Sequence, residues 1–224
     1  MRGKLGILFL HHDVNVIVLN NLQSIREHNP DAVIATISAG EALPKGYSID
    51  STPEVKARHS VMPKRSSDWI VCSWFLQRNE KCEKWWIVEW DTFCRTSVQD
   101  YYMPVWHFPF VASNVRLPYR EPKWAWFRNL IGIPTEYLPH LIGAPPFLYL
   151  ISDEALTAIC TELLKKPLDF CFGNGELRFA TIAKKCGFTP CAYSPPNDQI
   201  TWINWGTLAE FKTIFHPVKH YVNK

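Results

Sequence analysis

The sequence predicts a single α/β domain spanning residues 1–224, in which a Rossmann-like mixed sheet is flanked by helices. Residues 5–37 alternate strand, helix and strand patterns, as in a βαβ unit. Short apolar runs then alternate with helix-like segments along the rest of the chain, which is typical of α/β proteins. The length of 224 residues and the 47% hydrophobic content suit one globular domain of this class.

The net charge argues against a nucleic-acid partner, and the cysteine spacing argues against a structural zinc site. The formal net charge is only +3 and the chain has no long Lys/Arg run, so we expect no nucleic-acid partner. The seven cysteines are scattered without a repeated CxxC pair, which excludes the usual spacing of a structural zinc site. We interpret them as reduced thiols of a cytoplasmic protein.

The chain begins with the predicted βαβ unit. Residues 5–10 form an apolar run that is too short for a signal peptide, so we predict a first strand. A helix is expected over about 16–28, ended by Asn29-Pro30, and a second strand over 32–37. His11, Asp13 and Asn15 follow the first strand at the edge where such sheets bind ligands, so they are candidates to contact a nucleotide. The alternative for His11 is a strand-end residue that bonds to the backbone.

A loop and a buried helix follow. Residues 46–63 show no clear period and are predicted to form a loop. Ser66-Ser67-Asp68 is a good helix-capping cluster, and the helix expected over about 68–80 is apolar around most of its circumference. Asp68, with Arg65 nearby, could also reach a nucleoside; its alternative role is the cap itself.

The stretch Trp85-Trp86-Ile87-Val88-Glu89-Trp90-Asp91 predicts a strand buried on both faces. Side chains alternate along a strand, so Glu89 and Asp91 should point the same way at its carboxyl end. Two converging carboxylates repel each other unless a cation or proton lies between them. A divalent ion is a natural occupant. The alternative is that Asp91 caps a helix, which we expect within 92–102.

The second half of the chain is less regular. We expect a strand over 110–117 and then a long irregular segment over 118–146, with six prolines and the cluster Trp124-Ala125-Trp126-Phe127. A strand over 147–151, a helix over 152–165, a helix from Glu176 to Cys186 with Gly187 at its C′ position, and a strand over 188–193 should follow. Further elements are expected over 200–205 and 208–214.

This order of parts resembles a glycosyltransferase of the A-type fold. Glu89-Trp90-Asp91 matches the Asp-x-Asp metal motif, Gly173-Asn174-Gly175-Glu176 the acidic helix start, and His216-Pro217-Val218-Lys219 the late histidine. The resemblance implies a nucleotide-sugar-binding half over 1–117 and an acceptor-binding half over 118–224. Glu89 departs from the usual first Asp, which leaves Asp91 as the safer metal ligand.

The resemblance implies metal-dependent transfer of a sugar from a nucleotide-diphospho-sugar, with UDP as the expected nucleotide. A divalent cation, Mn2+ or Mg2+, would be held by Asp91, Glu89 and His216, and Lys219 would pair with a phosphate oxygen. Glu176 is the expected general base, kept ionised by the helix N-terminus, and the reaction would then invert the anomeric configuration. The alternatives are a capping role for Glu176 and a surface position for His216.

The acceptor would be a carbohydrate, a lipid-linked sugar or a protein. Trp124, Trp126, Asn174 and Gly175 are its expected contacts, because aromatic faces stack on sugar rings and glycine permits close approach. The tryptophans, with nearby Lys123 and Arg128, could instead form a patch for peripheral contact with a membrane, at its inner face. Core packing is the favoured alternative for these aromatic residues.

Two rival functions remain open from the sequence. A nucleotidyltransferase could use Asp91 and Glu89 to hold its metal. Such enzymes usually carry a Gly-rich basic loop after the first strand, whereas this chain has His11-His12-Asp13 there. A non-catalytic module that binds a nucleotide or a sugar is the third possibility.

Overall fold

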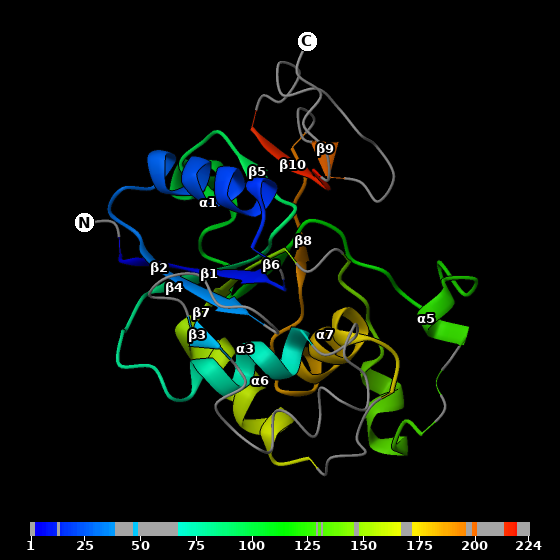
Figure 1. Ribbon diagram of the computed structural model, residues 1–224. Coiled ribbons are helices and arrows are strands. Elements are labelled where there is room, and N and C mark those ends of the chain that lie inside the picture. Colours follow the sequence, from blue (N-terminus) through cyan, green and yellow to red (C-terminus); the bar gives the residue numbers. More distant parts are fainter. Residues whose placement is uncertain are drawn as a thin grey trace.

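The computed structural model describes residues 3–12, 14–38, 47–48, 67–128, 130, 132–145, 148–166, 172–195, 199–200 and 213–218. Its strands form a seven-stranded sheet in the order β3-β2-β1-β4-β7-β6-β8 and a three-stranded sheet in the order β5-β10-β9 (Figure 1). The main sheet contains β1 (Leu5–His11), β2 (Val33–Ser38), β3 (Tyr47–Ser48), β4 (Lys84–Glu89), β6 (Phe110–Ala112), β7 (Tyr149–Ser152) and β8 (Cys191–Ala192). The small sheet contains β5 (Phe93–Cys94), β9 (Gln199–Ile200) and β10 (Ile214–His216).

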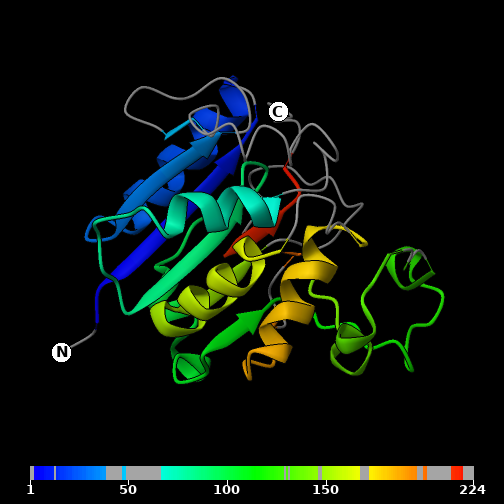
Figure 2. The same ribbon diagram turned by 90° about the horizontal axis from the view of Figure 1, so that it is seen from below.

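Helices cover both faces of the main sheet. They are α1 (Val16–His28), α3 (Ser67–Phe75), α4 (Val98–Tyr101), α5 (Ala125–Arg128), α6 (Asp153–Leu164) and α7 (Gly175–Lys185), with 3-10 turns η3 (Met103–Val105) and η4 (Thr135–His140). Figure 2 looks onto the face covered by α3, α6 and α7, and α1 lies behind the sheet. No helix in the described part of the chain is both long and apolar enough to span a bilayer.

β4 lies at the centre of the main sheet. Four of its six residues, Trp85 to Val88, have no exposed surface, which confirms the prediction of a strand buried on both faces. Trp85 and Ile87 pack with α3, α6 and α7, whereas Trp86 and Val88 pack with α1, as alternation along a strand requires. β4 is parallel to β1 and antiparallel to β7, so the sheet is mixed, as predicted.

Local signals at the helix ends account for several elements. Asn15 caps α1, because its side-chain oxygen accepts bonds from two backbone N–H groups of the first turn. Asn174 caps α7 in the same way. Gly187 follows the last residues of α7 with a φ of 93°, the left-handed conformation expected of a C′ glycine.

The prediction of a helix over 92–102 is wrong for its first residues. Phe93 and Cys94 form β5 and pair antiparallel with Phe215 and Ile214 of β10, so a distant partner overrides the local helical pattern. Only the short α4 follows, capped by Ser97. The strands predicted over 110–117 and 188–193 are likewise shorter, at Phe110–Ala112 and Cys191–Ala192. The loop predicted over 46–63 is wrong for Tyr47 and Ser48, which form β3 beside β2, and the rest of it lies outside the described residues. The elements predicted over 200–205 and 208–214 also lie mostly outside them.

A buried ion pair joins α3 to α7. Asp68 accepts bonds from Nε and Nη2 of Arg178 at 2.7 and 2.8 Å, and neither side chain is exposed. Nη1 of Arg178 also donates to the backbone oxygen of Phe172 at 3.1 Å. The pair therefore fixes the helix that carries Glu176 against the helix beside it.

Replacing Arg178 with methionine is expected to lower the free energy of unfolding by about 3–5 kcal/mol, because it leaves the Asp68 carboxylate buried and unpaired. Urea unfolding followed by circular dichroism measures this change. The half-buried Lys184 of the same helix provides the control, and Lys184→Met should change stability by about 0.5 kcal/mol or less. Equal stability of the two variants would contradict a structural role for the ion pair.

Candidate active site

The carboxyl ends of the parallel strands meet at one edge of the main sheet. His11 ends β1 opposite Ser38 of β2, and Glu89 ends β4 opposite Leu10. This edge is where ligands bind in open α/β sheets. β10 reaches the same edge, because it pairs with β5 just after Asp91 and the backbone N–H of Val218 donates to the Asp91 carbonyl at 2.6 Å.

Glu89, Asp91 and His216 converge at this edge. His216 Nε2 lies 3.2 Å from Asp91 Oδ1 and 3.9 Å from Glu89 Oε2. The side chains of Asp91 and His216 are 8% and 5% exposed, whereas that of Glu89 is 31% exposed. The structure thus brings together all three residues predicted to bind a metal.

The three side chains fit a divalent ion. Two ligand atoms that each lie about 2.1 Å from an octahedral ion are separated by about 3.0 Å at right angles and about 4.2 Å when opposite. The two distances from His216 Nε2 lie within this range, and no two of the three ligand atoms are more than 4.8 Å apart. Glu89 is the more exposed of the two carboxylates, so its side chain has more freedom than that of Asp91 to adjust to an ion.

Glu176 is the second residue of α7 and is 7% exposed. Asn174 Nδ2 donates to Glu176 Oε2 at 2.8 Å, and the Glu176 carbonyl accepts from Ala144 N at 3.3 Å. Burial raises the pKa of Glu176 from 4.5 to about 7, although the Asn174 bond and the Arg116 guanidinium lower it. The expectation that the helix N-terminus keeps Glu176 fully ionised is therefore corrected, because the helix end contributes only about 0.3–1 kcal/mol and desolvation outweighs it.

Tyr149 and Arg116 lie near Glu176, and neither was a candidate from the sequence. Burial raises the pKa of Tyr149, and the Glu176 and Glu89 carboxylates raise it further, so both carboxylates lie within electrostatic reach of this phenol. Arg116 exchanges two backbone hydrogen bonds with Gly143, at 2.8 and 2.9 Å, beside the Ala144 contact of Glu176. No local sequence signal predicts these contacts, because they join segments that are distant in the chain.

Only some of the residues predicted to contact the nucleotide lie at the carboxyl edge of the sheet. His11 does, because it is buried at the carboxyl end of β1. Asn15 is exposed, and its side-chain oxygen caps α1. The structure gives Asp68 a different role from a nucleoside contact, because both of its carboxylate oxygens bond to Arg178 inside the protein. The remaining candidates Asp13, Arg65 and Lys219 lie outside the described residues.

The predicted acceptor contacts are all buried or half-buried. Trp124 packs on Gly143, where a Cβ atom would lie 2.2 Å from the indole, and the centroid of its ring lies 4.8 Å from that of Phe127, which it meets edge-on. Trp126, half-buried on α5, also packs against the main hydrophobic core, so packing accounts for both tryptophans. Asn174 and Gly175 are buried beside Glu176.

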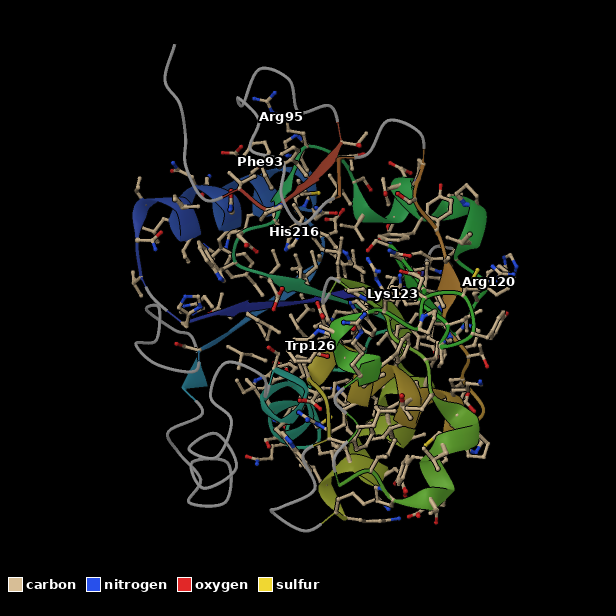
Figure 3. All side chains as sticks on the ribbon, turned by 90° about the vertical axis from the view of Figure 1, so that its right-hand side faces the viewer. Phe93, Arg95, Arg120, Lys123, Trp126 and His216 are labelled. Carbon is tan, nitrogen blue, oxygen red and sulfur yellow. The ribbon has the colours of Figure 1, made fainter. Side chains whose placement is uncertain are left out.

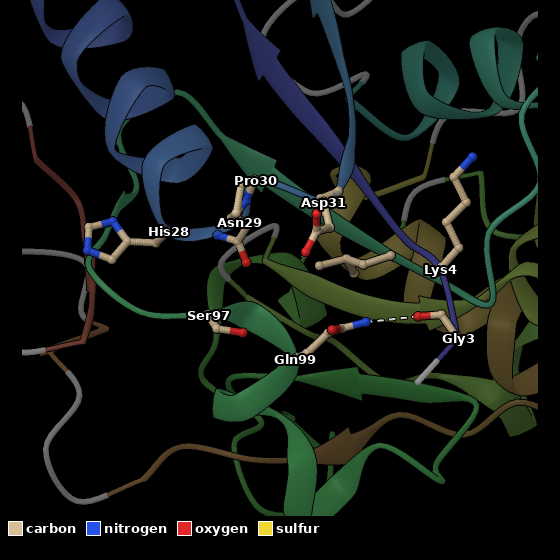
Figure 4. Close-up of a pocket in the computed structure, with 10 residues that line it drawn as sticks. Gly3, Lys4, His28, Asn29, Pro30, Asp31, Ser97 and Gln99 are labelled. Atoms are coloured by element: carbon tan, nitrogen blue, oxygen red, sulfur yellow. Dashed lines mark hydrogen bonds between the residues drawn. The ribbon is translucent and has the colours of Figure 1, made fainter. Parts of the chain in front are cut away.

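A separate polar cavity of about 420 Å³ lies at the opposite edge of the sheet (Figure 4). It is lined near the start of β1 and the end of α1 by residues that include Lys4, Asn29, Asp31 and Gln99. Gln99 Nε2 donates to the Gly3 carbonyl at 2.8 Å, and Asn29 bonds to the backbone of Ile25 and Val98. The side chains of Asn29 and Gln99 are therefore satisfied within the protein, and the cavity is remote from the carboxyl edge.

The mixed sheet with helices on both faces has the A-type glycosyltransferase fold, because two solved glycosyltransferases share its arrangement. The galactosyltransferase LgtC, solved with donor and acceptor sugar analogues, is similar over 87% of this chain and 75% of its own, with a TM-score of 0.50 and 14% identity. Mouse xyloside xylosyltransferase 1, in its apo form, is similar over 95% of this chain and 96% of its own, with a TM-score of 0.50 and 14% identity. No protein-family model and no curated protein sequence matches the chain.

Proposed function

We propose that this protein is a metal-dependent glycosyltransferase that moves a sugar from a nucleotide-diphospho-sugar to an acceptor hydroxyl. The observation that carries the proposal is the meeting of Glu89, Asp91 and His216 at the carboxyl edge of an A-type glycosyltransferase fold. The similar structures support a sugar-transfer chemistry, since they are named a galactosyltransferase and a xylosyltransferase.

Asp91 and His216 would hold a divalent cation, Mn2+ or Mg2+, with Glu89 as a third ligand or as a group that orients the ion. The ion, when bound, would neutralise the charge that develops on the diphosphate leaving group. The fixed backbone contact between Val218 and Asp91 supports this role, because it holds the carboxylate and the imidazole in one place before a ligand arrives.

Glu176 would act as the general base. A carboxylate with a pKa of about 7 is well matched to accept a proton from a hydroxyl near neutral pH. Asn174 would hold Oε2, which leaves Oε1 to accept the proton of the acceptor hydroxyl. The oxygen of that hydroxyl would then attack the anomeric carbon, the bond to the diphosphate would break, and the configuration would invert.

The donor is proposed to be UDP-linked, with His11, Asp13, Asn15, Arg65 and Lys219 near the nucleotide. His11 supports this placement best among the described residues, because it lies at the same sheet edge as Glu89. On the acceptor side, Trp126, Asn174 and Gly175 remain the proposed contacts.

A thermal-shift panel of nucleotide-sugars, with and without Mn2+, tests the proposal. A ligand at 100 times its Kd stabilises the folded protein by about 2.7 kcal/mol, so the correct donor should raise the unfolding midpoint by several degrees. We expect this rise only when Mn2+ is present. Equal shifts with nucleoside triphosphates and release of pyrophosphate would favour a nucleotidyltransferase, and donor binding without turnover of any acceptor would favour a binding module.

A further inference from the structure

Four exposed residues between positions 119 and 128 form a basic and aromatic surface that the proposed reaction does not use. Tyr119 is 75% exposed, and Arg120, Lys123 and Arg128 are exposed as well. Trp126, the proposed acceptor contact in this segment, packs against the main hydrophobic core and is not counted with them. We call Tyr119, Arg120, Lys123 and Arg128 the α5 surface.

The α5 surface carries three positive charges. Glu121 is the acidic residue of the segment, and it forms an ion pair with Arg116. Among the described residues, no carboxylate pairs with Arg120, Lys123 or Arg128. The Arg120 guanidinium instead lies over the Tyr119 ring, 5.6 Å from its centroid. Three exposed cations and an exposed aromatic ring thus lie within one short segment of the chain.

Packing within the segment holds this surface in a fixed shape. Trp124 lies against Gly143, and Phe127 is only 9% exposed. Backbone hydrogen bonds from Trp124 to Glu121 and from Phe127 to Trp124 make successive turns. The buried aromatic residues therefore stabilise the segment, whereas the exposed cations and Tyr119 are not needed for its packing.

The α5 surface lies on the same side of the molecule as the candidate active site. Figure 3 is seen from the right-hand side of Figure 1, which is where α5 lies and toward which β1 runs, whereas His216 is buried.

We propose that the α5 surface binds the surface of a bilayer that contains anionic lipids. Each Lys or Arg close to such a bilayer contributes about fivefold to the partition constant, and aromatic rings insert at the level of the headgroups. The charge sign of the surface and the exposed Tyr119 match both requirements. The proposal is independent of the proposed reaction, since it concerns residues outside the metal cluster and the candidate base.

Vesicle sedimentation of the full chain tests this inference. We expect binding to vesicles of phosphatidylcholine in which about a third of the lipid is replaced by phosphatidylglycerol, and little binding to phosphatidylcholine alone. The variant Arg120→Gln/Lys123→Gln/Arg128→Gln should lose roughly two orders of magnitude in partition, and added salt should weaken the parent in the same way.

A matched control removes three exposed charges from the opposite edge of the sheet. Lys4→Gln/Arg26→Gln/Lys81→Gln changes the net charge equally and should retain most of the binding to anionic vesicles. Equal losses in the two triple variants, or equal binding of the parent to both kinds of vesicle, would overturn the proposal. So would binding to a single-stranded oligonucleotide that is as tight as binding to the vesicles and is lost in the same variant. All three proteins should share one unfolding midpoint, since every substituted side chain is exposed.

Discussion

Replacing Asp91 with alanine is expected to abolish the stabilisation by Mn2+ and to reduce donor turnover by at least about 10²-fold, because a metal ion supplies several kcal/mol of transition-state stabilisation. Asp91 is the more buried of the two carboxylates, and its Oδ1 lies 3.2 Å from His216 Nε2. Thermal unfolding with and without Mn2+, together with release of the nucleoside diphosphate, measures both effects. Glu89→Ala should give a smaller loss in each measurement, since Glu89 is about one-third exposed.

The control for Asp91 is Asp31→Ala, which removes an exposed carboxylate near the cavity at the opposite edge. It should leave the metal response unchanged. Asp91→Asn separates a metal role from a packing role, because it keeps the side-chain volume and the backbone bond from Val218. If the Asp91→Asn variant responds to Mn2+ as the parent does, or if turnover in the parent needs no divalent ion, the metal site is refuted.

Local patterns in the sequence predict much of this fold. The apolar run of Trp85 to Val88 predicts a strand buried on both faces, and β4 has this environment. Gly187 is predicted at the C′ position of α7 and has the left-handed conformation that this position favours. Such features depend on neighbours within a few residues, so they can be predicted without a structure.

Features that depend on distant partners could not be predicted in the same way. β5 forms because Phe93 meets Phe215, and nothing near Phe93 indicates that partner. Asp68 is a plausible helix cap in the sequence, yet its carboxylate lies against Arg178 of another helix. The convergence of Glu89 and Asp91 could be anticipated from strand alternation, but His216 could be added to them only because the resemblance to a known fold paired a late histidine with the acidic motif.

The environment of Glu176 shows the same limit in energetic terms. Its position near a helix start is visible in the sequence and favours the ionised form by about 0.3–1 kcal/mol. Its burial, which follows from the packing of α7 against the sheet, is not visible and favours the neutral form more strongly. The outcome is a carboxyl group that changes its charge near neutral pH.

Replacing Glu176 with glutamine is expected to reduce transfer by about 10²–10⁴-fold, the usual contribution of a general base. Donor binding, measured as the thermal shift with Mn2+, should remain. In the parent, transfer should rise with pH through about 7 as Glu176 loses its proton, and the residual rate of the variant should lack this rise. A rate that instead falls through this range would refute the base, since only the ionised carboxylate can accept a proton.

The same substitution has a predicted effect on stability, and its sign follows from the pKa. Because the pKa is about 7 in the folded protein and 4.5 ordinarily, the unfolded chain releases this proton first, so the parent loses stability as pH rises from about 4.5 to 7. Glu176→Gln removes this loss. It should therefore be more stable than the parent by about 3 kcal/mol above pH 7 and about equal to it below pH 4.5, as urea unfolding at several pH values would measure.

Glu154→Gln is the matched control for both measurements, because Glu154 is also the second residue of its helix, α6, but is exposed. It should change neither transfer nor the pH dependence of stability. If Glu176→Gln is more stable and has lost transfer but still binds donor, the buried carboxylate lowers the free energy of unfolding of the parent and is required as the base. If the variant is more stable and keeps full transfer, Glu176 is a buried carboxyl group without a role in the reaction, and the inverting mechanism loses its base.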